Sequence, residues 1–179
     1  MKADSLTIRR ARPEDVPQIT ALAKQYELKR LSPEDAEKFG FLVSRFAEED
    51  YTRFLQYADH FYVMTKTDEL MGFLLAYSSN FIKPDEWLNM LIRARHPEPF
   101  VLIKQIAVHP HHQGQGVASH LYNYLFDQVR GRSLFTVIVI DPPNRRSIAF
   151  HERMGFHKVF EAIPPDGFPR GVWKREAVP

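Results

Sequence analysis

The chain has 179 residues, of which 44% are hydrophobic and 26% charged, with a formal net charge of +2. This length and composition are typical of a globular protein with a buried core, so we expect a single domain over residues 1–179. The near-neutral charge argues against a nucleic-acid partner, and the absence of cysteine excludes disulfides, thiolate metal sites and a cysteine nucleophile. No stretch has the length of a membrane span, and charges interrupt residues 1–10, so we predict no signal peptide, no membrane partner and a cytoplasmic location.

Hydrophobic periodicity divides the chain into short strands and helices. In chain order it predicts a strand over 6–9, a helix over 12–23, an interrupted helical region over 32–55, a hairpin of 61–66 and 71–77, a short helix after 84, a strand over 100–108, a helix over 117–129, a strand over 134–140, a helix over 145–154 and a hairpin of 156–163 and 172–175. Prolines followed by acidic residues begin the first helices, and glycines end the later ones. The order predicts an α/β protein, more closely α+β, with helices on a mixed sheet.

The interrupted region contains an apolar face at helical spacing. We predict that one amphipathic helix contains Phe39, Leu42, Val43 and Phe46.

Residues 104–118 are the most informative segment, because an apolar strand there enters a glycine-containing loop that opens a helix. Gly114 and Gly116 lack side chains, so the amides from Gly114 to Ser119 can converge on a phosphate at the positive helix end. A P-loop would need lysine and then serine or threonine after its last glycine, and a dinucleotide-binding loop would need a third glycine. On this pattern alone, a turn that binds nothing remains the alternative.

The full string Gln113-Gly114-Gln115-Gly116-Val117-Ala118 resembles the Gln/Arg-x-x-Gly-x-Gly/Ala signature of the GNAT superfamily of N-acetyltransferases, which bind acetyl-coenzyme A. The preceding segment 106–110 and the later segment 144–156 are also similar to that family. The resemblance implies a mostly antiparallel sheet with a splayed central strand pair and helices on both faces. It also implies acetyl-coenzyme A as co-substrate, with no metal.

The resemblance implies a set of coenzyme-binding residues. Ile106 and Val108 would offer their main chain to the acetyl carbonyl and the pantetheine arm, and the Ile106 N–H would stabilise charge on the thioester oxygen. The alternative for these two side chains is core packing, and both roles are compatible. The implied set is Ile106, Val108, Gln113, Gly114, Gln115, Gly116, Val117, Ala118, Ser119 and Asn144.

Two residues of the 144–156 segment have a second interpretation. Asn144 matches a position that contacts the pantetheine arm, but an asparagine that opens a helix is also a natural N-cap. His151 stands where many family members have a tyrosine that protonates the departing thiolate, which makes His151 the candidate general acid. The alternative is a partly buried histidine that only forms hydrogen bonds.

The strand over 100–108 contains no carboxylate, so no base is assigned from the sequence. The unranked candidates are Glu27, Asp85, Glu86 and Asp141. His109, His111 and His112 invite a metal site, but no acidic residue accompanies them, and a solvated loop is the preferred interpretation.

We therefore predict direct transfer of an acetyl group to a primary amine of a small molecule, and Trp87 is a candidate lining residue of the acceptor pocket. A homodimer is compatible with this prediction. The alternatives are a non-catalytic coenzyme-A-binding sensor, an acetyltransferase for protein N-termini or lysines, and a purely structural interaction domain.

Overall fold

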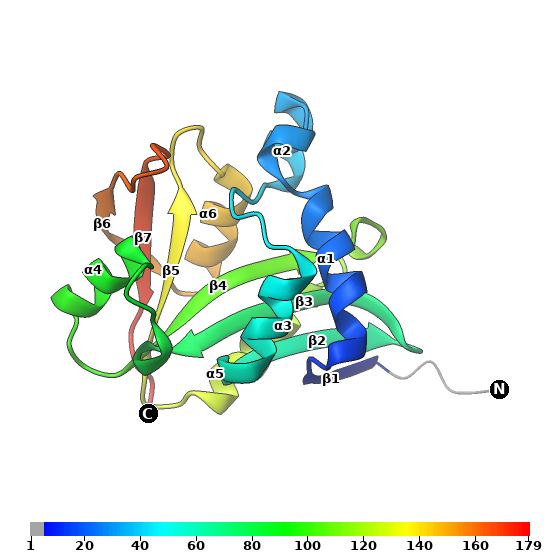
Figure 1. Ribbon diagram of the computed structural model, residues 1–179, viewed down its shortest axis with the longest axis horizontal. Coiled ribbons are helices and arrows are strands. Elements are labelled where there is room, and N and C mark those ends of the chain that lie inside the picture. The colour runs from blue at the N-terminus through cyan, green and yellow to red at the C-terminus, as the bar shows by residue number, and fades with distance from the viewer. Residues whose placement is uncertain (1–5) are drawn as a thin grey trace.

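A seven-stranded sheet organises residues 6–179, which are the residues that the computed structural model describes (Figure 1). The strands are β1 (Leu6–Arg10), β2 (His60–Lys66), β3 (Glu69–Ser78), β4 (Phe100–Val108), β5 (Ser133–Val139), β6 (His157–Ala162) and β7 (Arg170–Arg175). Their order is β1-β2-β3-β4-β5-β7-β6, and among the described strands only β4 and β5 pair in parallel. The predicted mixed, mostly antiparallel sheet is confirmed.

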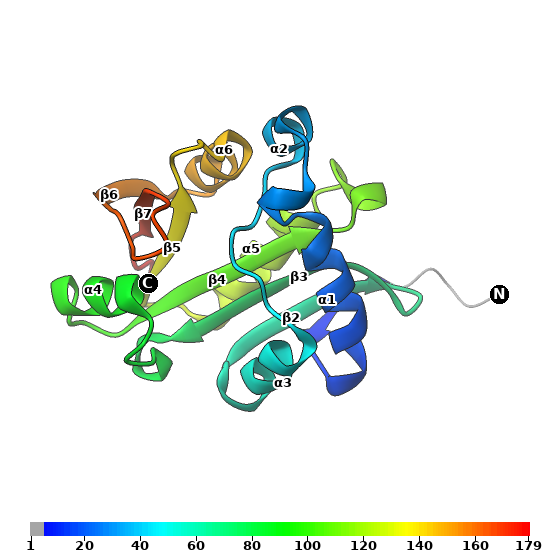
Figure 2. The ribbon, with the colours of Figure 1, turned by 45° about the horizontal axis from the view of Figure 1, so that its top comes forward.

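Residues 6–179 also form six α-helices. They are α1 (Val16–Gln25), α2 (Pro33–Phe39), α3 (Glu48–Tyr57), α4 (Trp87–Arg95), α5 (Val117–Gln128) and α6 (Arg145–Arg153). Figure 2 shows α1 and α3 in front of β2–β4, with α5 behind the same strands.

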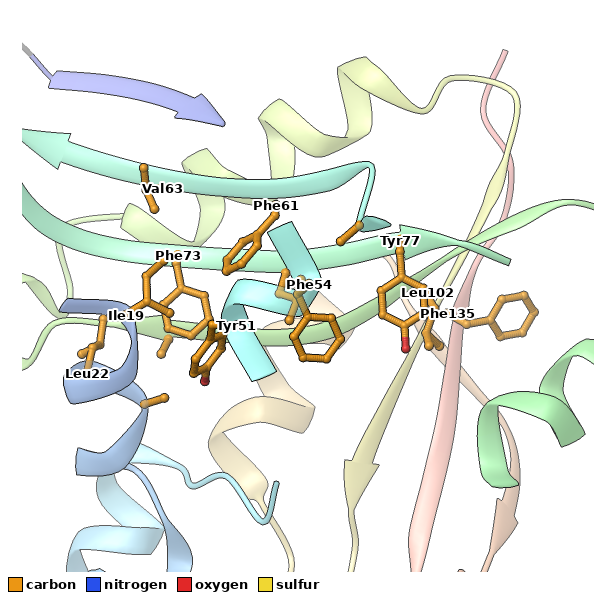
Figure 3. Close-up of a cluster of buried hydrophobic side chains, with 14 of the residues drawn as sticks. Ile19, Leu22, Tyr51, Phe54, Phe61, Val63, Phe73, Tyr77, Leu102 and Phe135 are labelled. Carbon is orange, nitrogen blue, oxygen red and sulfur yellow. The ribbon is translucent and has the colours of Figure 1, made fainter. Parts of the chain in front are cut away.

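Both faces of the sheet are buried under apolar side chains. On the face under α1 and α3, Ile19, Tyr51 and Phe73 are fully buried in one cluster (Figure 3). On the opposite face, Leu121 and Leu125 of α5 are fully buried in a second cluster. Burial of one such side chain contributes about 1.5–3 kcal/mol, so these clusters hold the helices to the sheet.

The central strands β4 and β5 separate after a short paired stretch. They pair from Phe100 opposite Ser133 to Ile103 opposite Thr136, and beyond Ile103 they no longer pair. The register between β3 and β4 shifts at the same place, which leaves Lys104 as the extra residue of a β-bulge. Because a bulge bends its strand, it turns β4 away from β5 and produces the splayed pair that the resemblance implied (Figure 1).

The predicted helix through Leu42, Val43 and Phe46 is wrong. Helix α2 ends at Phe39 because Gly40 follows with a positive φ of +76°, which does not continue a helix. The chain is then extended, and Leu42 bonds the segment after α1: its N–H donates to Tyr26 O (2.6 Å) and its carbonyl accepts from Leu28 N (2.9 Å). Helix formation resumes only at Glu48.

The remaining elements lie close to their predicted positions. The first hairpin turns at Thr67 and Asp68, whose positive φ angles of 46° and 69° are those that a two-residue type I′ turn requires. None of the helices within residues 6–179 has the length and apolar character needed to cross a bilayer. Part of the signal-peptide prediction falls on residues 1–5, which lie outside the described residues.

Candidate functional site

A cavity of about 950 Å³ lies where β4 and β5 separate. Its walls come from the separated strands, the chain after α2, the glycine loop, α6, the start of α4 and the loop between β6 and β7. A cavity of this size is typical of sites that hold a cofactor or small molecule. We call the part lined by the glycine loop and α6 one end of the cavity, and the part lined by the start of α4 and the β6–β7 loop the other end.

The glycine loop exposes unpaired main-chain donors to the cavity. Gly114 and Gly116 have φ angles of +75° and +77°, which favour glycine. Gly116 is the N-cap of α5 and no side chain caps this helix, so the first-turn N–H groups of Val117, Ala118 and Ser119 have no partner within it. These five residues line the cavity, as an anion site at a helix start requires.

Gln113 also lines the cavity, but its side chain forms a bond within the protein. Its Nε2 donates to the Tyr26 hydroxyl at 2.6 Å, and that hydroxyl donates to the Val108 carbonyl at 2.6 Å. Tyr26 therefore joins the end of α1 to the glycine loop and to β4. Sequence reasoning missed this residue, because its two partners lie more than 80 positions away (82 and 87).

Gln115 is the one predicted coenzyme-binding residue that does not line the cavity, within the part of the chain that the structure describes. Its side chain is exposed and donates to the His111 carbonyl at 3.1 Å. His111 lies in a histidine turn in which the rings of His109 and His111 are 5.0 Å apart. Residues 6–179 contain no cluster of three or more His, Cys, Asp or Glu that could bind a metal ion.

The main chain of β4 faces the cavity at Ile106 and Val108. His109 N donates to Met71 O of β3 at 2.7 Å, and hydrogen-bonding direction alternates along an antiparallel strand. The N–H and C=O groups of Ile106 and Val108 therefore point away from β3, toward the space that β5 has left. Since Tyr26 occupies the Val108 carbonyl, the Ile106 groups and the Val108 N–H are those left for a ligand.

Asn144 is buried at the N-cap position of α6, yet its side chain does not cap the helix. Its Nδ2 donates to the Phe41 carbonyl at 2.8 Å, and its Oδ1 is buried without a hydrogen-bond partner. A Cβ atom at Gly40 would lie 3.0 Å from this Oδ1. Because a buried acceptor without a donor is costly, Oδ1 is suited to an N–H group of a bound molecule.

His151 borders the cavity but is only 2% exposed. Its Nδ1 lies 2.7 Å from the Ser147 carbonyl, which fixes the proton on that nitrogen, and its Nε2 accepts from the Tyr122 hydroxyl at 2.5 Å. Burial lowers the pKa of His151 to about 4. Both ring nitrogens are thus engaged within the protein, which disfavours the predicted general-acid role and fits the alternative of a buried, hydrogen-bonding histidine.

The other end of the cavity contains charged side chains. The Lys104 Nζ lies 3.7 Å from the Glu86 Oε1, and burial lowers the pKa of Lys104 against the opposing effect of Glu86. Glu86 also accepts hydrogen bonds from the Tyr77 hydroxyl and from Lys83 N, the latter at 2.9 Å. Trp87, which is 46% exposed, lines the cavity as predicted.

Of the four carboxylates named as candidate bases, Asp85 and Glu86 line the cavity. Glu27 is buried elsewhere against Arg30, and Asp141 is exposed outside the cavity wall. Sequence reasoning did not select Lys104, although a cation inside an otherwise mostly apolar strand was a visible signal.

The comparisons with known proteins agree with this architecture. The model of the acetyltransferase (GNAT) family matches residues 23–156. No curated protein is significantly similar to the chain in sequence.

Among solved structures, the ribosomal-protein-S18-alanine N-acetyltransferase from Escherichia coli is 16% identical, with a TM-score of 0.64 over 98% of this chain and 96% of that one. A GNAT-family acetyltransferase from Streptococcus agalactiae is 16% identical, with a TM-score of 0.67 over 95% and 94%. NAA60 from Arabidopsis thaliana, solved with acetyl-CoA, is 15% identical, with a TM-score of 0.60 over 95% and 98%. At these identities the similarity shows the fold.

Proposed function

Since this chain belongs to the GNAT acetyltransferase family, whose members use acetyl-coenzyme A, we propose that it transfers the acetyl group directly to a primary amine of a small molecule. The observation that supports this most strongly is the continuity of the cavity. It connects unpaired main-chain donors at the glycine loop with a chamber of charged side chains at Lys104 and Glu86. A donor and an acceptor can therefore meet at the β4 bulge.

The residues of the glycine-loop end fit the coenzyme. The amides of residues 116–119 suit its diphosphate, and the side chains of Arg145, Arg146 and Arg153 add positive charge along the same wall. The buried Asn144 Oδ1 suits an amide N–H of the pantetheine arm. The exposed main chain of Ile106 and Val108 suits the added-strand pairing of that arm.

Bound acetyl-coenzyme A supplies a thioester carbonyl that an amine can attack. The Ile106 N–H would stabilise the negative charge that develops on the carbonyl oxygen. The attacking amine must lose a proton, and Asp85 and Glu86 are the candidate bases that border the same space. We assign His151 a positioning role, because it holds Tyr122 and the start of α6 together.

The confinement of the acceptor end supports a small acceptor. Residues 41–44, the start of α4 and the loop residues Pro164, Pro165 and Asp166 all line the cavity. A cavity of about 950 Å³ has room for a small amine beside the end of the pantetheine arm.

The test is release of free thiol from acetyl-coenzyme A, measured against a panel of small amines and short peptides. We expect release that depends on a small amine, with mass spectrometry showing an acetylated product. Tight coenzyme binding without any amine-dependent release would instead establish the sensor alternative. Release with peptides alone would establish a protein acetyltransferase, and no coenzyme binding would leave only the interaction domain.

A further inference from the structure

Two hydrogen-bond donors at the acceptor end of the cavity have no acceptor. Lys104 Nζ has its ion-pair partner, Glu86 Oε1, at 3.7 Å, beyond hydrogen-bond length, and no other residue of 6–179 accepts from it. Gln105 is 3% exposed, and its Nε2 is buried without a partner. Both residues line the cavity.

The β-bulge brings these two neighbours to the same face of the sheet. The Lys104 Nζ lies 5.9 Å from the centre of the Phe46 ring, and the Phe46 ring is 5.8 Å from that of Tyr51. The Tyr51 hydroxyl in turn donates to Gln105 Oε1 at 2.7 Å. Consecutive residues of a regular strand would point to opposite faces, so it is the bulge that lets both donors approach one ligand.

The other cation at this end is already satisfied. Arg170 donates to both carboxylate oxygens of Asp166, at 2.7 and 2.6 Å, and to the Phe168 carbonyl at 2.8 Å. Lys104 is therefore the cation with unused donors here, and its side chain is only 22% exposed. A buried ammonium without hydrogen bonds is unfavourable, and an oxygen anion would remove that cost.

Building on the proposed acetyl transfer, we infer that the acceptor amine also carries an oxygen anion, a carboxylate or a phosphate, and that Lys104 and Gln105 bind it. The facing carboxylate of Glu86 matches the ammonium of the same molecule. The oppositely charged pair of Lys104 and Glu86 is thus complementary to a small zwitterion. Trp87, at the rim, is placed to contact the apolar part of such a molecule.

The decisive experiment compares acceptors that differ only in the anion. The common α-amino acids are each paired with their amides, and 2-aminoethyl phosphate is paired with ethanolamine, in the thiol-release assay. A hydrogen bond to a charged group corresponds to a factor of about 10–100 in binding. We expect at least one anionic acceptor to exceed its neutral partner by about that factor in kcat/KM, mostly through KM.

The preferred pair shows which anion is bound. A preference among the amino acids identifies a carboxylate, and a preference for the aminoethyl ester identifies a phosphate. The amine of an amino-acid amide is less basic than the amine of the amino acid itself. Differences in amine basicity alone would therefore favour the amide, which is the opposite of the expected result.

Lys104→Met tests the assignment to this side chain. We expect the ratio between the preferred acceptor and its neutral partner to fall to about one. Lys24→Met removes the same charge from an exposed position of α1 outside the cavity, and it should leave the ratio as in the wild type. Wild-type ratios near one, or a Lys104→Met variant that slows both members of a pair equally, would overturn the inference.

A binding experiment tests the anion site even if the protein does not transfer acetyl groups. If no amine stimulates thiol release, the same pairs are titrated calorimetrically into protein saturated with coenzyme A. Binding of an anionic member to the wild type but not to Lys104→Met would support the anion site without catalysis. Absence of binding by every anionic member would refute the site.

Discussion

The buried pair of His151 and Tyr122 predicts a specific acid sensitivity of the fold. Burial lowers the pKa of His151 to about 4, whereas an unfolded histidine titrates near 6.5. Between these values the unfolded chain binds a proton that the folded protein excludes. The contribution of His151 to stability is therefore complete above pH 6.5 and is lost as the pH falls toward 4.

The size of the effect follows from the two pKa values. The proton bound only by the unfolded chain lowers the free energy of unfolding by roughly 1 kcal/mol at pH 5.5 and roughly 3 kcal/mol at pH 4.5. Losses of this size are a large part of the stability of a typical domain. They should be visible as a lower midpoint of urea unfolding.

The assay compares urea unfolding of the wild type and His151→Phe at pH 7, 5.5 and 4.5. Other groups titrate equally in both proteins, so the difference between their pH dependences isolates His151. We expect the variant to be less stable than the wild type at pH 7, because the Tyr122 hydroxyl loses its partner, yet to lose less stability on acidification. His157→Phe is the matched control, since that side chain is 55% exposed.

Equal pH dependences in the wild type and His151→Phe would refute this reasoning. The same variant also tests the catalytic assignment of His151. Loss of a general acid costs about 10²–10⁴ in turnover with coenzyme affinity intact. We expect a far smaller loss in kcat, so a loss in that range would restore His151 as the acid.

Three further outcomes test the coenzyme end. Acetyl-coenzyme A at a hundred times its dissociation constant should stabilise the protein by about 2.7 kcal/mol, seen as a rise of several degrees in Tm. Gly116→Val should weaken coenzyme binding more than tenfold in calorimetry, because its φ of +77° strains a β-branched residue and the strained loop would shift the amides of the anion site; unchanged affinity in a folded variant would contradict our placement of the phosphates. Tyr26→Phe removes the bonds to Gln113 and Val108, and we expect a roughly tenfold rise in the KM for acetyl-coenzyme A with the fold retained; an unchanged KM would separate this tyrosine from the coenzyme site.

Local patterns in the sequence were sufficient to predict those elements whose structure depends on neighbouring residues. The strand over 100–108 was predicted at its observed bounds, and the start of the helix at Val117 was correct, because periodicity and glycine act within a few positions. The segment after Gly40 shows the opposite case. Its apolar residues have helical spacing, but pairing of Leu42 with the chain after α1 outweighs that preference.

Long-range contacts explain most of what the sequence did not reveal. His151 has the position of a proton donor, and only the tertiary structure shows that Ser147 and Tyr122 occupy its ring nitrogens. The bulge at Lys104 depends on the register between β3 and β4, which no local pattern encodes.

The two ends of the cavity differ in the chemistry that recognises a ligand, and this difference explains why one end was predictable. At the coenzyme end, the proposed recognition uses mainly main-chain groups, those of residues 106, 108 and 116–119, with side chains of α6 and Asn144 beside them. The amides of residues 116–119 need only two glycines and a helix start, and these leave a motif in the sequence. At the acceptor end, Lys104, Gln105 and Glu86 act through side chains from separate elements, so substitutions there can change the acceptor without altering the coenzyme site. A single exchange at Lys104 should therefore change which amine is used while leaving the affinity for acetyl-coenzyme A the same.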